Sequence, residues 1–65
     1  MEGFGERLRN ERKKAKLTQE QLAEMIDMSH AFIGHLERGT RIPSVETVVR
    51  LCRALGIGSD QLLGV

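Results

Sequence analysis

The sequence predicts an all-α protein, a compact bundle of five short helices. No stretch alternates between apolar and polar residues over a useful length, so strands are not expected. Apolar residues instead recur at helical spacing, and capping residues and glycines separate the runs. A chain of 65 residues is long enough for one domain, taken as residues 1–65, and has no room for a second ligand-binding or catalytic domain.

The first two helices are expected at residues 4–15 and 19–26. Phe4, Leu8 and Ala15 give the first helix its apolar positions. Thr18 is a good N-cap for the second helix, and Gln21 stands three residues later, as in a capping box.

Three more helices are expected at residues 29–38, 45–55 and 59–63. The third is capped by Ser29 and ends at Gly39, a residue that suits the left-handed position after a helix. Pro43 and Ser44 precede the fourth helix, which ends at Gly56. Its apolar face consists of Val48, Leu51, Cys52 and Leu55.

The break between the second and third helices is very short, which predicts a helix-turn-helix unit over residues 18–38. Ala23 is small enough to let the two helices cross closely, and Ile33 and Leu36 are expected to anchor the third helix to the core. The opposite face of this helix carries His30, Ala31, Phe32, Gly34, His35 and Arg38. A face with an aromatic ring and two imidazoles but little charge suits contact with base edges and thymine methyl groups.

Charge and composition narrow the possible partners. The net charge is only +1, but residues 1–16 carry six basic side chains against three acidic ones, which favours an anionic partner as much as a solvated helix face. The chain has no apolar run long enough to cross a membrane and no signal-peptide core, and its one cysteine excludes an internal disulfide framework. These features predict a cytoplasmic protein with no membrane partner.

No arrangement of residues indicates catalysis or metal binding. His30 and His35 are five residues apart and do not share a helix face, and Cys52 occupies a core position. We therefore expect no enzyme activity, no metal, no cofactor and no small-molecule ligand.

The ordered set of motifs resembles the lambda-repressor-like helix-turn-helix family, the phage repressor and Cro type that is also called the XRE family. The resemblance runs from about Phe4 to Leu63. It is carried by Gln19-Glu20-Gln21-Leu22-Ala23, Met28-Ser29, Ile33, Leu36-Glu37-Arg38-Gly39, Arg41-Ile42-Pro43-Ser44, Ala54-Leu55-Gly56 and Asp60-Gln61-Leu62-Leu63.

The resemblance implies that helix 29–38 reads the major groove of double-stranded DNA. By position, it implies base contacts by His30, Ala31 and His35, with Phe32 and Gly34 nearby. It implies contacts to the phosphate backbone by Arg12, Thr18, Gln19, Arg38, Thr40 and Arg41. Because so small a domain covers only a few base pairs, a homodimer on a palindromic operator is expected. The best candidates for the dimer surface are the end of helix 45–55, the last helix and the residues after it.

Arg12 and Glu37 both stand where the apolar stripes of their helices predict a hydrophobic residue. Two misplaced charges of opposite sign most simply satisfy each other, and the resemblance implies an Arg–Glu pair at these positions. The chain departs from the family at Asp27, where Gly is usual, and at Gly34 and Gly58.

The predicted function is sequence-specific DNA binding in transcription regulation, with repression favoured over activation. The alternative is a protein-interaction module, such as an antitoxin or adaptor, with the same fold. The low net charge and Phe32 favour this alternative slightly, and the capped, cation-flanked helix favours DNA.

Overall fold

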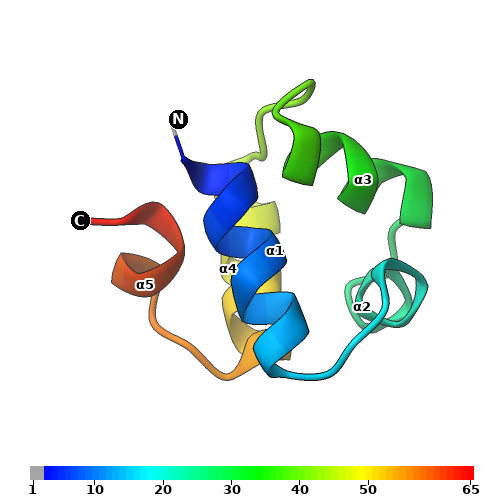
Figure 1. Cartoon of the computed structure of the whole chain (residues 1–65), viewed down its shortest axis with the longest axis horizontal. Helices are drawn as coiled ribbons and strands as arrows, with labels where there is room; N and C mark the ends of the chain where they lie inside the picture. The colour runs from blue at the N-terminus through cyan, green and yellow to red at the C-terminus, as the bar shows by residue number, and fades with distance from the viewer. Residues whose placement is uncertain (1–2) are drawn as a thin grey trace.

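Five α-helices joined by short turns make up the computed structural model, which describes residues 3–65 (Figure 1). The described residues contain no strand, so the predicted all-α, five-helix class is confirmed. The helices are α1 Phe4–Lys14, α2 Gln19–Met25, α3 His30–Arg38, α4 Val45–Leu55 and α5 Ser59–Leu63.

The predicted helix bounds differ from the observed ones by at most one residue. α1 and α2 each end one residue early because Ala15 and Ile26 are their C-caps. α3 begins at His30 rather than Ser29 because Ser29 is the N-cap and has an extended backbone. Differences of this size are ordinary at helix ends, where the last hydrogen bonds fray.

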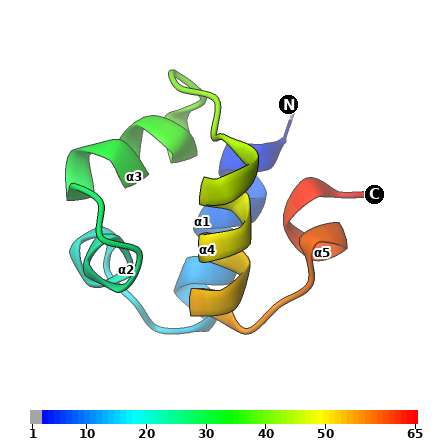
Figure 2. The same cartoon turned by 180° about the vertical axis from the view of Figure 1, so that it is seen from behind.

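Every helix contributes to one apolar core. The fully buried large side chains are Leu8, Leu22, Ile33, Leu36, Leu51 and Leu62. Burying each one contributes about 1.5–3 kcal/mol. α3 packs against both α1 and α2, whereas α5 packs against α1 and α4. Figures 1 and 2 accordingly place α3 and α5 on opposite sides of the molecule.

Side-chain caps define where α2, α3 and α4 begin. Thr18 Oγ1 accepts a hydrogen bond from Gln21 N at 3.0 Å, and Gln21 Oε1 accepts one from Thr18 N at 2.9 Å. This reciprocal pair is the predicted capping box. Ser29 Oγ accepts from the backbone N–H of Phe32, and Ser44 Oγ accepts from that of Thr47.

The turn between α2 and α3 has a left-handed residue at Asp27, with φ of 58°. A side chain in this region costs about 1–2 kcal/mol, although Asp tolerates it better than most residues. The next residue, Met28, donates its N–H to Ala23 O at 2.9 Å and closes the turn. At position 27, where the sequence resemblance leads us to expect Gly, Asp therefore takes the left-handed conformation.

Two contacts of α1 determine how it sits against its neighbours. A Cβ atom built on Gly5 would lie 2.6 Å from Leu36 O, and closer still to Glu37 O. The first turn of α1 therefore touches the backbone at the end of α3. Arg7 donates from Nε to Leu62 O at 3.1 Å and from Nη2 to Leu63 O at 3.1 Å, which ties α1 to the C-terminal end of α5.

Candidate nucleic-acid interface

α3 has one face in the core and one face toward solvent. Ile33 and Leu36 have no exposed surface, and α3 packs against α1 and α2. His30 and Ala31 are exposed in the first turn of the helix. The helix lies at the edge of the molecule (Figure 1). Its outer face is thus open to a large partner.

Phe32 is less open than the helical pattern suggests. Its ring is half-buried and packs against the core. The guanidinium of Arg41, in the loop after α3, lies 5.7 Å from the ring centroid. At this distance the positive charge is attracted to the π-face of the ring. Phe32 therefore links α3 to the loop after it, and it holds a basic side chain beside the outer face.

Gly34 is buried although it lies on the outer half of α3. A Cβ atom at this position would lie 2.9 Å from Arg38 Nη1, so the Arg38 guanidinium covers the glycine backbone. Arg38 itself is exposed. The side chain that reaches solvent at this point of the helix is therefore Arg38.

His35 and Thr40 contact each other at the end of α3. His35 Nδ1 lies 2.8 Å from Thr40 Oγ1, and the same hydroxyl lies 3.2 Å from His35 O. Thr40 N also donates to His35 O at 3.0 Å. Gly39 has the expected left-handed backbone, with φ of 79°, and this turns the chain so that Thr40 meets His35.

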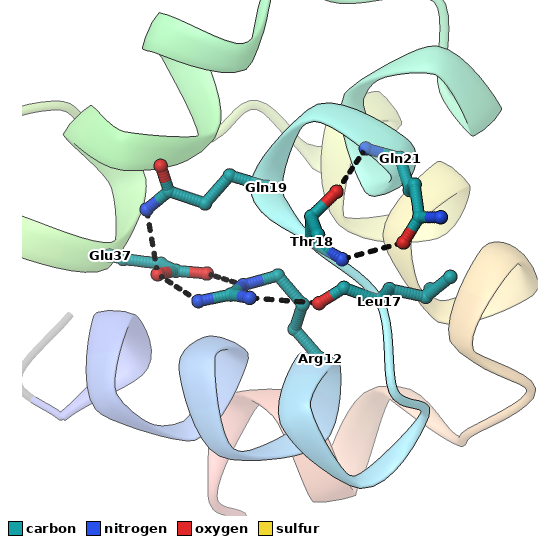
Figure 3. A network of polar contacts seen from close by, with 6 residues as sticks. All are labelled: Arg12, Leu17, Thr18, Gln19, Gln21 and Glu37. Atoms are coloured by element: carbon teal, nitrogen blue, oxygen red, sulfur yellow. Dashed lines mark hydrogen bonds and ion pairs between the residues drawn. The ribbon is translucent and has the colours of Figure 1, made fainter.

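Behind the outer face, a buried polar network joins α1, α2 and α3 (Figure 3). Arg12 Nε lies 2.6 Å from Glu37 Oε2, and Arg12 Nη2 donates to Glu37 Oε1 at 3.1 Å. Arg12 Nη1 donates to Leu17 O at 2.8 Å, and Gln19 Nε2 donates to Glu37 Oε1 at 3.1 Å. Only 11 % of the Arg12 side chain and 5 % of the Glu37 side chain are exposed.

The structure brings together some of the residues that the sequence singled out and separates others. His30, Ala31 and His35 lie along α3, with Arg38, Thr40 and Arg41 at and beyond its end. Arg12 and the side-chain amide of Gln19 are turned inward to Glu37 instead. The hydroxyl of Thr18 accepts the cap hydrogen bond of α2.

Within residues 3–65 no group of three or more His, Cys, Asp or Glu side chains is arranged to hold a metal ion. In that same part of the chain, no helix combines the length and the apolar character needed to cross a membrane. Burial, followed by the nearby charge of Asp60, raises the pKa of the Cys52 thiol, so this thiol is a core group of low reactivity.

Comparison with known proteins agrees with this geometry. The family described as "Helix-turn-helix" matches residues 8–62. The chain is 38 % identical over 60 residues to the immunity repressor protein of Bacillus phage phi105. The aligned region covers 92 % of this chain and 42 % of that protein. It is 36 % identical over 61 residues to the control protein C.BamHI of Bacillus amyloliquefaciens, with 92 % of this chain and 75 % of that protein covered.

Two solved structures have the same fold. The restriction-modification controller protein C.AhdI of Aeromonas hydrophila superposes with a TM-score of 0.87 at 37 % identity, over 91 % of this chain and 89 % of that one. The P22 c2 repressor in complex with a synthetic operator superposes with a TM-score of 0.85, at the same identity and coverage. This chain belongs to the helix-turn-helix family of DNA-binding transcription regulators, of the phage repressor type.

Proposed function

We propose that this chain places α3 in the major groove of double-stranded DNA and represses transcription from the site it binds. The observation that carries the proposal is the division of α3 into a fully buried face and an open outer face. The likeness to the P22 c2 repressor supports it, because that protein is described in complex with a synthetic operator. This function places the protein in the cytoplasm.

The outer face divides into base-reading and phosphate-binding parts. His30, Ala31 and His35 face the base edges, and the ring of Phe32 lies beside them at the first turn. Gly34, which is buried beneath the Arg38 guanidinium, leaves room for that side chain to lie against α3. Arg38 and Arg41 contact the phosphates, which position the protein without reading sequence, whereas the hydroxyl and the N–H of Thr40 are both bonded to His35. At the start of α2, Thr18 and Gln19 contact the phosphate backbone of the same half-site, Gln19 through its main-chain N–H because its side-chain amide is bonded to Glu37. For Arg12 the buried ion pair with Glu37 is the principal role.

Selection of bound duplexes from a random DNA pool tests this function. A selected duplex is expected to bind with an affinity that falls steeply as salt is added. Arg41→Ala should weaken binding to all duplexes alike and should reduce the slope of log affinity against log salt concentration by about one. His35→Ala should instead relax the base preference at one position. Arg53→Ala is the matched control, because Arg53 is exposed near the C-terminus of α4, the end that points away from α3 (Figure 2). Absence of salt-dependent binding would contradict the proposal.

We also propose that two copies bind a palindromic operator, with half-sites about 34 Å apart. The surface that supports this is an apolar groove between α4 and α5. It is lined by Pro43, Val45, Val48, Val49, Ser59 and Leu63. Val45 is 82 % exposed and Val49 is 41 % exposed, and an exposed apolar patch of this kind favours contact with a second protein surface.

Sedimentation of the free chain tests the dimer. Val49→Lys is expected to shift the chain to monomer and to weaken operator binding, because a charge on a buried contact is left unpaired. Met25→Lys, also at an exposed apolar residue but on α2, is expected to leave the association unchanged. A chain that stays monomeric up to about millimolar concentration, with or without DNA, would refute the dimer.

A further inference from the structure

We infer that Thr40 fixes the tautomer of His35, so that α3 reads an exocyclic amino group, adenine N6 or cytosine N4, at the base that His35 faces. The inference rests on the proposed DNA-binding function and adds the chemistry of one base contact. It makes Thr40 a positioning residue for His35.

The hydroxyl of Thr40 has two neighbours but only one proton. His35 Nδ1 is 2.8 Å away and His35 O is 3.2 Å away. The carbonyl oxygen accepts hydrogen bonds and never donates them, so the hydroxyl proton is directed to it. The remaining contact then requires Nδ1–H to donate to Oγ1. In the opposite arrangement the hydroxyl donates its proton to Nδ1. The lone pairs of Thr40 Oγ1 and His35 O then face each other, which is unfavourable.

The same arrangement determines what Nε2 offers to a partner. A neutral imidazole has one donor nitrogen and one acceptor nitrogen, so a protonated Nδ1 makes Nε2 the acceptor. Nε2 makes no hydrogen bond to any other group of residues 3–65. In that part of the chain every fully buried side-chain nitrogen or oxygen has a partner. Nε2 is therefore open to solvent, and it presents a lone pair on the outer half of α3.

In the major groove, a lone pair selects a donor. The donors on base edges are the amino groups at adenine N6 and cytosine N4, whereas N7 and O6 of guanine and N7 of adenine are acceptors. His35 with an accepting Nε2 is thus matched to an amino group and mismatched to purine N7. With Nδ1 accepting from Thr40 instead, Nε2–H would select the opposite set of atoms.

Thr40 is itself held in place by the backbone. Its N–H donates to His35 O at 3.0 Å, and Gly39 turns the chain in the left-handed region just before it. The hydroxyl is thus delivered to the imidazole by the turn that ends α3. A variant that loses only the hydroxyl therefore removes the contact that fixes the tautomer and keeps the imidazole.

Duplexes in which one functional group of a base is changed test this assignment. Selection with the wild-type chain and with His35→Ala first identifies the base pair that His35 reads. At that pair, deleting the amino group, with purine for adenine or 2-pyrimidinone for cytosine, is expected to weaken binding about two- to tenfold. Replacing purine N7 by carbon, as in 7-deazaadenine or 7-deazaguanine, is expected to leave binding unchanged.

Two variants of Thr40 separate positioning from a structural effect. Thr40→Val keeps the shape but loses the hydroxyl, and it should abolish the difference between the two kinds of analogue. Thr40→Ser keeps the hydroxyl and should preserve the difference, and thermal melting checks that both variants fold. Discrimination that survives in Thr40→Val overturns the role of Thr40.

Loss of binding with the 7-deaza duplex alone overturns the tautomer. If His35→Ala alters no position while the wild-type chain still selects duplexes, this inference fails and the proposed function stands. If the wild-type chain selects no duplex, the proposed function itself fails.

Discussion

Glu37→Ala tests whether the network in Figure 3 holds α3 in place. The glutamate accepts two hydrogen bonds from Arg12 and one from Gln19. Without the carboxylate, Arg12 keeps only its bond to Leu17 O. The guanidinium of a side chain that is only 11 % exposed would then be left without a counter-charge.

The expected loss in the free energy of unfolding is about 3–5 kcal/mol, the usual result of removing one partner of a buried ion pair. A chain of 65 residues has a total stability of roughly 3–10 kcal/mol, so the variant should lose a third of it or more. Because each kcal/mol shifts Tm by about 4–8 °C in a domain of this size, the midpoint should fall by at least about 12 °C.

Urea unfolding followed by circular dichroism measures this loss. Glu46→Ala is the matched control, because it removes the exposed Arg50–Glu46 pair on α4, and such pairs contribute at most about 1 kcal/mol. The double variant Arg12→Met/Glu37→Leu should recover most of the stability, since apolar side chains can replace a buried pair. A loss below about 1 kcal/mol for Glu37→Ala would refute the reasoning.

Four further predictions concern the backbone and the core. Gly5→Ala should lower the free energy of unfolding by about 1–3 kcal/mol, because its Cβ meets backbone oxygens of α3. Gly34→Ala should raise it by about 0.5–1 kcal/mol, because only the flexible end of Arg38 must move. Urea titration measures the free energy of unfolding of both variants. Equal changes would contradict the different surroundings of Gly5 and Gly34. Asp27→Gly should raise Tm by relieving the left-handed strain, and a lower Tm would exclude that strain. The pKa of Cys52 is raised by burial and then by Asp60. The folded chain therefore binds this proton more tightly than the unfolded chain, so stability should fall as the pH rises past the range in which a free thiol ionises. Cys52→Ala should lack this fall, and alkylation should be slower in the folded chain than in urea.

The local features of the fold were predictable from sequence because they depend on neighbouring residues. Thr18 and Gln21 form the capping box, and Gly39 has the left-handed backbone, as their spacing predicts. Helix signals of this kind act within one turn. The five helices could therefore be predicted to within a residue of their ends.

The features that were not predicted depend on contacts between segments far apart in the chain. Nothing in the sequence indicates that Gly5 touches the backbone of α3, or that Arg7 reaches the end of α5. The spacing of charges singled out Arg12 and Glu37, but it gave no reason for Gln19 to join them. A helical projection also gives only the direction of Phe32, and not that Arg41 covers its ring.

Within α3, the residues that hold the helix and those that face outward are almost entirely separate. Ile33, Leu36 and Glu37 supply its attachment, while His30 and Ala31 take no part in the core. New side chains at positions 30 and 31 would therefore leave the stability of the bundle nearly unchanged. Under the proposed function, the outer positions of α3 can be exchanged to alter the preferred DNA site without redesigning the interior.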